Sequence, residues 1–574
     1  MTPNGVLHVW PLLLGGFKMV VKKAAQFCVP VIMALLLLSC GSPAAVQEKG
    51  GTAAPELCFT ILQVNDVYKI EGLEGGGVGG IARLRTLRKR LETEGRPALV
   101  LHAGDILFPS VMSKYLRAQP MILTLNLLDG NPAAFDQNLV AVFGNHEFDD
   151  ADPGIVLGRV AQSDFSWVSS NVRYRSTKDA PGEPFSSRLK NVHDTLVLTI
   201  GNVPVGIFGL TVDARRRDYV AYDYEITARR AIVREAINHL KGAGARVIIA
   251  LTHQDLEQDR LLAADFPEIN FIIGGHEHFF IQEQVGRTWI TKADADAKSA
   301  VVYGVKAPLN APVEVTVRKV DMGRDIEKDP IVEEEVKKSL QELSDAIAKQ
   351  TGRSIQAEIG RTEYLLEGVE PAVRGRETAL GNFLADVIRE KMNTDMAFVN
   401  GGGIRINDNI PPGTIRVYDM EGIFYYDDDL TAFELTGAEI IEVLRNSVSK
   451  THLGDGRFLQ VSGIRFKYHV SGTLQNPVYG VNQEDVEVMH RGATGYVPLE
   501  INRTYSAGAT NYLWENGYQD GYKIFSKGNK GTSPERLDKP PAIGFRKATE
   551  EKIASLKDRT VTTRIEGRIV SVPQ

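Results

Sequence analysis

The residues best suited to chemistry are an asparagine, histidines and aspartates that follow apolar runs. One such run is 139–143, and Gly144-Asn145-His146 follows it directly, with Asp149 three residues later. A buried strand that ends in a glycine turn would deliver these side chains to the carboxyl edge of a sheet, where open α/β sheets bind ligands. Carboxylate, amide and imidazole groups together suit divalent zinc, manganese or iron.

Further apolar runs end in side chains of the same kinds, namely Asp66 after 57–64, Asp105 after 98–102, His253, and the pair His276 and His278. If these ends share one sheet edge, there are enough groups for two ions. Asp105 could bridge the ions, because each of its oxygens can serve one of them. The other candidate ligands then form two sets. One ion would be bound by Asn145, His253 and His276. The other would be bound by Asp66 and His278.

The order Asp, Gly-Asp, Gly-Asn-His-Glu, His and Gly-His-x-His resembles the signature of the calcineurin-like metallophosphoesterases. With its C-terminal half added, the chain resembles the bacterial and animal 5′-nucleotidase family from about residue 57 onward. The resemblance implies an α/β and α+β fold. A four-layer α/β/β/α metallophosphoesterase domain at 57–325 would precede a linker helix at 329–352 and a separate α/β substrate-binding domain at 353–574. The charged helix could alternatively be a coiled-coil dimer segment.

The same resemblance implies a metal-dependent phosphohydrolase that releases phosphate from nucleotides. Two cations ~3.5–4 Å apart would stabilise the attacking and leaving oxygens and supply metal-bound hydroxide for in-line attack. In the family the histidine of Gly-Asn-His-Glu faces the phosphate, so His146 would be catalytic, with Asp149 as its orienting partner. Asp149 could instead only cap the helix that follows, although Asp150 or Asp152 could also do so. Nucleotide sugars, diphosphates and 2′,3′-cyclic nucleotides are further possible substrates.

One position departs from the family pattern. The first family block is Asp-x-His, with both residues as ligands, whereas this chain has Asp66-Val67-Tyr68. Tyrosine is a poor ligand for divalent ions, because its pKa of about 10 must be overcome. Three outcomes are open: a weakened but filled site, a phenolate that selects ferric iron, or an empty site. The last would make the protein a weakly catalytic or non-catalytic surface nucleotide-binding lipoprotein. The other intact motif residues favour an enzyme.

The C-terminal half contains the residues that match the family's nucleoside-binding positions. Arginine suits an anion by bidentate donation, and two tyrosines would sandwich the base, with Trp514 as an alternative to the second. An aspartate would bind the ribose hydroxyls. The substrate-binding residues implied by the resemblance are Arg374, Asn400, Gly403, Arg405, Tyr426, Tyr512 and Asp520.

The N-terminus resembles an export signal. Lysines precede an apolar run at 24–38, which is 15 residues long, whereas a spanning helix needs ~20, so we expect a signal peptide at 1–39. The sequence Leu37-Leu38-Ser39-Cys40 looks like a bacterial lipobox. It predicts a lipidated Cys40, a tether at 40–56 and a cell-envelope location on the periplasmic or surface side of a bacterial membrane. Cleavage with simple release is the alternative.

The charge of the chain bears on its partners. A formal net charge of -6 argues against nucleic-acid binding, which usually needs a concentrated basic face. The expected partner is therefore a nucleotide substrate, with membrane attachment only through the N-terminal lipid. The sequence leaves the oligomeric state open.

Overall fold

The computed structural model describes residues 58–95, 97–213, 217–473, 477–525, 534–537 and 542–573. The signal peptide at 1–39, Cys40 and the tether at 40–56 lie outside the described residues. Within these residues, no helix combines the length and the apolar character needed to cross a membrane. The chain from Pro55 to Gln574 forms one compact unit, within which an N-terminal and a C-terminal domain share side-chain contacts.

A pair of stacked sheets forms the centre of the N-terminal domain over its described residues. The first sheet has the strand order β16 (Glu314–Asp321), β15 (Ser299–Lys306), β1 (Cys58–Val64), β2 (Ala98–His102), β3 (Asp136–Val142), β4 (Phe165–Val168) and β7 (Val192–His193). The second sheet has the order β13 (Ile281–Val285), β14 (Thr288–Lys292), β12 (Phe271–Gly274), β11 (Val247–His253), β9 (Val203–Thr211) and β8 (Thr195–Ile200).

The strands that lead into the motifs run parallel to one another. In the first sheet β1, β2 and β3 pair in parallel, and in the second β9, β11 and β12 do so. Side chains alternate between faces: Leu99 and Leu101 of β2 enter the core between the sheets, whereas Ala98 and Val100 face the helices. Parallel pairing therefore brings the carboxyl ends of these strands to one edge.

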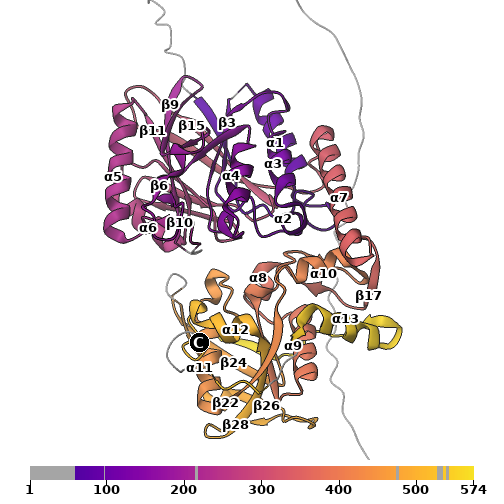
Figure 1. Ribbon diagram of the computed structural model, residues 1–574. Coiled ribbons are helices and arrows are strands. Elements are labelled where there is room, and N and C mark those ends of the chain that lie inside the picture. Colours follow the sequence, from indigo (N-terminus) through magenta and orange to yellow (C-terminus); the bar gives the residue numbers. More distant parts are fainter. Residues whose placement is uncertain are drawn as a thin grey trace, which may run out of the picture. The chain divides into compact units, whose positions relative to one another are not determined.

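Helices cover the outer face of each sheet (Figure 1). Apolar side chains of α1 (Ile81–Thr93), α3 (Gln119–Leu125) and α4 (Pro153–Ala161) pack on the first sheet. Those of α5 (Ile226–Gly242) and α6 (Leu256–Asp265) pack on the second. The layers run helix, sheet, sheet, helix, which confirms the predicted α/β/β/α arrangement.

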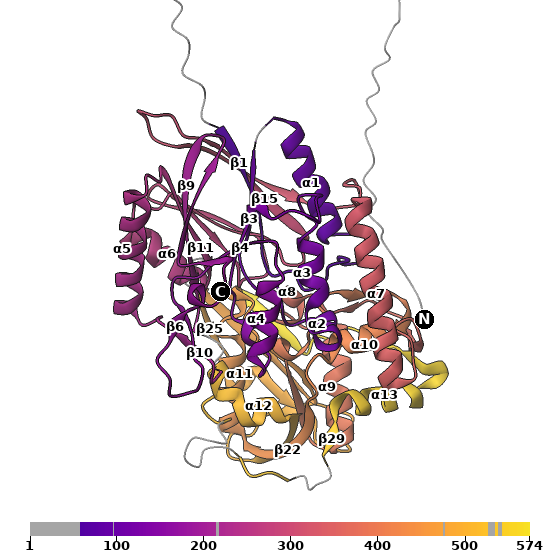
Figure 2. The ribbon, with the colours of Figure 1, turned by 45° about the horizontal axis from the view of Figure 1, so that its top comes forward.

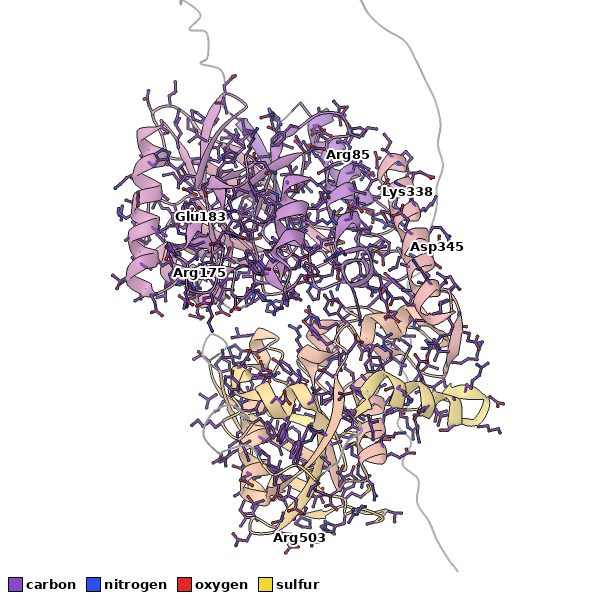
Figure 3. All side chains as sticks on the ribbon, viewed as in Figure 1. Arg85, Arg175, Glu183, Lys338, Asp345 and Arg503 are labelled. Atoms are coloured by element: carbon purple, nitrogen blue, oxygen red, sulfur yellow. The ribbon has the colours of Figure 1, made fainter. Side chains whose placement is uncertain are left out.

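Helix α7 (Pro330–Thr351) connects the domains. The side chain of Asp329 caps its N-terminus, and Gly352, with φ of 73°, ends it. Its buried apolar residues, including Val332 and Ile347, belong to the same core cluster as α1 and α3. Exposed Lys338 and Asp345 lie on the outer face of the helix (Figure 3). The apolar stripe is thus covered by this chain's own helices.

The C-terminal domain is built on a sheet with the order β23 (Leu459–Ser462), β19 (Met396–Asn400), β28 (Thr504–Thr510), β22 (Asp429–Thr436) and β29 (Ile543–Gly544). Helices α11 (Gly437–Val448) and α12 (Asn511–Asn516) contact β22 (Figure 2). Arg374 directly follows helix α8 (Glu370–Val373), α10 (Val417–Ile423) precedes Tyr426, and α12 carries Tyr512. Helix α9 (Ala379–Met392) packs on β19 and β23, and α13 (Phe545–Ser555) packs on α9. A second sheet contains β24 (Ile464–Gly472), β25 (Pro477–Gly480), β26 (Val486–Val488), β27 (Val497–Pro498) and β31 (Ile569–Pro573).

A buried ion pair ties α1 to the start of β3. The guanidinium of Arg88 donates to both oxygens of Asp136, with Nη2 3.0 Å from Oδ1, and the two side chains are 2% and 5% exposed. The Asp136→Ala change should lower the free energy of unfolding by about 3–5 kcal/mol, because it leaves a buried cation without its main partner. Urea denaturation followed by circular dichroism measures this loss.

The matched control for that experiment is Glu183→Gln. Glu183, labelled in Figure 3, pairs with Arg188 through side chains that are 43% and 39% exposed. Exposed pairs contribute about 0–1 kcal/mol. A loss for Asp136→Ala no larger than that of the control would contradict the structural importance of the Arg88 pair.

Candidate active site

The candidate metal ligands converge where the parallel strands end. Asp66, Asp105 and His278 offer ligand atoms that all lie within 4.8 Å of one another. Nε2 of His253 lies 3.3 Å from Oδ2 of Asp105 and 3.2 Å from Oδ1 of Asn145. Side chains from separate strand ends of both sheets therefore form one cluster.

His276 joins this cluster through the same oxygen of Asn145 that His253 contacts. Its Nδ1 lies 3.2 Å from Oδ1 of Asn145, and its Nε2 lies 3.6 Å from Oδ1 of Asp255. The interaction with His276 is the main reason that the pKa of Asp255 falls to about 2. Sequence reasoning missed Asp255, and its position two residues after His253 was the only available signal.

Strained backbone marks this part of the molecule. Asp66, Asp105 and His276 have φ of 53°, 55° and 85°, in the left-handed region that side-chain-bearing residues rarely adopt. Such conformations cost of the order of 1–3 kcal/mol each and persist only where the surroundings fix them. The fold therefore holds these three side chains in place against a local preference.

The carboxylate of Glu147 fixes the strained loop around Asp105. Glu147 is fully buried and accepts hydrogen bonds from the backbone N–H groups of Asp105 and Leu107, each at 3.1 Å. The N–H groups of Ile106 and Gly144 also donate to it. Glu147 belongs to the same motif as Asn145 and His146, and its role is to anchor the neighbouring loop.

The charges of the cluster suit a bound cation. Burial opposes ionisation of Asp66, but its interactions with His278 and His253 outweigh burial and hold its pKa at about 2. The pKa of Asp105 is likewise well below its usual range, because His253 and His146 outweigh its burial. Nδ1–H of His253 donates to the carbonyl of Ala103 at 2.8 Å, so Nε2 is the nitrogen that faces the carboxylates. Burial lowers the pKa of His253, but the charges of Asp105 and Asp66 outweigh it and raise that pKa to about 10. A bound cation would therefore replace the Nε2 proton. Ionised carboxylates, an amide oxygen and imidazole nitrogens fit divalent zinc, manganese or iron.

The hydroxyl of Tyr68 lies inside this cluster. It is 3.2 Å from Oδ1 of Asp66, 3.0 Å from Oδ2 of Asp105 and 3.1 Å from Nε2 of His278. Burial, and then the charge of Asp105, raise the pKa of the phenol well above its usual value. The departure from the family pattern thus falls at the point where three candidate ligands meet.

His146 and Asp149 form a pair beside the cluster. Nδ1 of His146 lies 2.8 Å from Oδ2 of Asp149, and both side chains are about one-tenth exposed. The alternative role for Asp149, capping the next helix, belongs to Asp152, whose Oδ1 accepts from the N–H of Gly154 at 2.8 Å. Asp149 is therefore positioned to orient His146.

A cavity of about 430 Å³ adjoins the cluster. His146 and His276 line it from the N-terminal domain. Trp514 is instead packed in the core of the C-terminal domain, where its Nε1 donates to the carbonyl of Pro534 at 3.1 Å. The predicted substrate residues that line the cavity are Arg374, Asn400, Gly403, Arg405, Tyr426, Tyr512 and Asp520.

Other charged groups of the site have no counterpart in the sequence prediction. Lys450 and Asp455 line the same cavity. Glu370 contacts both lining arginines, with Oε1 2.6 Å from Nη2 of Arg374 and 2.9 Å from Nη1 of Arg405. The only sequence signal for Glu370 was its place four residues before Arg374, which is ordinary helical spacing.

Comparisons with known proteins agree with this two-domain site. The family model "Calcineurin-like phosphoesterase" matches residues 59–280, and the model "5'-nucleotidase, C-terminal domain" matches residues 358–527. The snake venom 5′-nucleotidase of Crotalus adamanteus is 25% identical over 538 residues, which cover 85% of each chain. The human 5′-nucleotidase is 25% identical over 514 residues, covering 81% of this chain and 84% of that one.

Solved structures share the fold. The structure of a 5′-nucleotidase precursor from Thermus thermophilus matches with a TM-score of 0.71 and 24% identity, covering 90% of this chain and 99% of that one. The sulfate thiohydrolase SoxB of the same organism matches with a TM-score of 0.65 and 17% identity, covering 89% and 96%. Proteins whose names describe different activities therefore share this architecture.

Proposed function

The chain belongs to the 5′-nucleotidase family, and on that premise we propose that it hydrolyses nucleoside 5′-monophosphates to a nucleoside and phosphate. The observation that carries this proposal is a single cavity lined by His146 and His276 from one domain and by Arg374, Arg405 and Tyr512 from the other. A phosphate, a ribose and a base each have chemically suitable neighbours there. Nucleotide sugars, diphosphates and 2′,3′-cyclic nucleotides are further proposed substrates.

The cluster at the strand ends would hold two divalent cations. When bound, the cations polarise the phosphoryl group, stabilise the attacking and leaving oxygens and lower the pKa of water. Asp105 would contribute to both cations, and the hydroxyl of Tyr68 would lie beside the cation that Asp66 and His278 hold. The proposed ligands are Asp66, Asp105, Asn145, His253, His276 and His278.

The chain's own side chains would bind and orient the substrate. Arg374 and Arg405 would hold the phosphate by charge-assisted hydrogen bonds. Tyr426 and Tyr512 would stack on the two faces of the base, and Asp520 would accept hydrogen bonds from the ribose hydroxyls. These contacts would fix the phosphoryl group beside His146. Such positioning raises the rate, because a bound substrate reacts with a neighbouring catalytic group as if both belonged to one molecule.

His146 would assist departure of the nucleoside oxygen. Because Oδ2 of Asp149 accepts a hydrogen bond from Nδ1–H of His146, with the two heavy atoms 2.8 Å apart, a proton on Nε2 is directed away from Asp149. We propose that this proton passes to the leaving alkoxide or stabilises its developing charge. Imidazole suits this role at neutral pH, and positioned acids of this kind contribute about 10²–10⁴-fold in rate.

The direct test is phosphate release from AMP by the full chain. Activity should disappear after chelation and return with manganese, zinc or iron. The His146→Ala change should lower kcat by about 10²–10⁴-fold, whereas His239→Ala, on the exposed face of α5, should leave it unchanged. No turnover with any of these metals, despite AMP binding, would overturn the hydrolase proposal.

A second candidate function is nucleotide binding with little or no turnover, and the position of Tyr68 favours it. Its hydroxyl lies 3.0–3.2 Å from Asp66, Asp105 and His278, where it would either serve as a ligand or block one. If the metal site formed by Asp66 and His278 binds its ion weakly because of Tyr68, Tyr68→His should raise both the bound-metal content and kcat. The metal content is measured by inductively coupled plasma mass spectrometry. Unchanged values for both would count against this explanation.

The choice between Tyr512 and Trp514 as the second stacking residue can be tested by binding. Stacking on an aromatic side chain is worth ~1–3 kcal/mol per base, so Tyr512→Ala should weaken adenosine binding by about 5–150-fold. Tyr512→Phe should keep most of the affinity, because the ring remains. Trp514→Phe should leave affinity unchanged, since Trp514 is buried in the domain core. Weaker binding only in the Trp514 variant would reverse the assignment.

We also propose that the protein is exported and anchored by lipid on Cys40. The apolar run at 24–38 followed by Cys40 supports this, as do relatives described as a venom protein and as a precursor. The anchor is tested by growing bacteria that express the protein with radiolabelled palmitate. The protein should carry the label, and the Cys40→Ala variant should not. The proposal includes no nucleic-acid partner.

A further inference from the structure

Glu370 connects the two domains at the cavity. It is the first residue of α8 and is 2% exposed. Its Oε2 contacts Nδ1 of His278 in the N-terminal domain. Its Oε1 lies 2.6 Å from Nη2 of Arg374 and 2.9 Å from Nη1 of Arg405. A buried carboxylate requires such partners to be stable, and here they come from both domains.

The contact with Glu370 determines which nitrogen of His278 faces the ligand cluster. A carboxylate can only accept, so Nδ1 of His278 carries the proton. Nε2 is then left with its lone pair towards Oδ1 of Asp66, 3.1 Å away. Histidines that bind metals almost always donate their other N–H to such a partner, which fixes the ring and raises its basicity. Loss of the carboxylate should therefore weaken metal binding.

The contact of Glu370 with the two arginines should weaken the binding of a phosphate, whereas its contact with His278 should strengthen the binding of a metal. Arg374 and Arg405 are neighbouring cations that are largely enclosed but line the cavity. Partial burial, and then the charge of Arg405, lower the pKa of Arg374 to about 10. Glu370 neutralises part of this charge. An incoming phosphate needs the same guanidinium donors and is repelled by the carboxylate, so Glu370 should compete with it.

We propose that Glu370 is a positioning residue that links the metal site to the phosphate-binding site. It strengthens metal binding through His278 and weakens phosphate binding through Arg374 and Arg405. This inference rests on the proposed function, because it assumes that His278 is a ligand and that the arginines bind phosphate. A purely structural interdomain salt bridge would differ, since its loss would weaken binding of both ligands.

The test uses the full-length chain and the Glu370→Gln variant. Titration calorimetry with manganese should show binding weakened by about 10–100-fold, the usual effect of losing a partner behind a ligand histidine. In the chelated protein, where no turnover occurs, AMP should bind at least about fivefold more tightly, because the competing negative charge is gone. Adenosine affinity should not change, since adenosine lacks the phosphate.

The matched control is Glu367→Gln. Glu367 lies three residues earlier and pairs with the half-exposed Arg376, so its loss should change neither affinity. If Glu370→Gln fails to fold, Glu370→Asp replaces it. Its shorter side chain keeps the charge near the arginines but withdraws from His278, so manganese should bind more weakly and AMP about as in the wild type.

The outcomes separate this inference from the proposed function. If the wild-type chain binds neither manganese nor AMP, the proposed function fails. If the wild type binds both ligands but Glu370→Gln weakens both, or alters neither, only the link through Glu370 is overturned. Opposite changes for manganese and AMP, with adenosine unaffected, support the link.

Discussion

The structure depends on a pair of carboxylates, those of Asp66 and Asp105, held away from water at the ends of parallel strands. Burying a negative charge is costly unless positive groups or donors surround it, and both aspartates have left-handed backbone. The fold meets these demands with histidines from the second sheet and with Glu147, which holds the loop of Asp105. A site built against local preference at several positions is typical of function.

The second domain completes what the first begins. The strand ends supply the candidate metal ligands and His146, whereas the proposed partners for a phosphate, a sugar and a base lie in the C-terminal domain. The cavity has lining residues from both. Contacts such as Asn407 with Asp296 and Lys69 with Asp408 hold the domains together beside it. The cavity thus brings groups suited to a phosphate from both domains into one space.

Much of the architecture could be predicted from the sequence, because strands and motifs are visible as local patterns. Apolar runs ending in Asp66, Asp105 or His253 are strands. The order of the motifs resembles that of the metallophosphoesterases, and this resemblance predicted the four-layer arrangement. The grouping of Asn145 with His253 and His276, and of Asp66 with His278, followed from ligand chemistry. In the structure Oδ1 of Asn145 lies 3.2 Å from both His253 and His276, and Asp66 and His278 cluster with Asp105. The division of these groups between two ions stays a prediction.

The rest depends on tertiary contacts that no spacing reveals. Asp255 and Glu370 act on His276 and His278 only because separate loops meet in space. The position of Trp514, the alternative stacking residue, is set by the packing of its domain core. Such partners are invisible to pattern reasoning because they have no fixed distance along the chain.

The most direct measurement is a crystal structure of the protein with manganese and a non-hydrolysable AMP analogue, with manganese located by anomalous scattering. We expect two manganese ions at the strand ends, both with Asp105 as a ligand, the analogue's phosphate beside His146 and its base at Tyr512. Ions bound elsewhere, or a nucleotide whose phosphate lies away from the strand ends, would contradict this expectation.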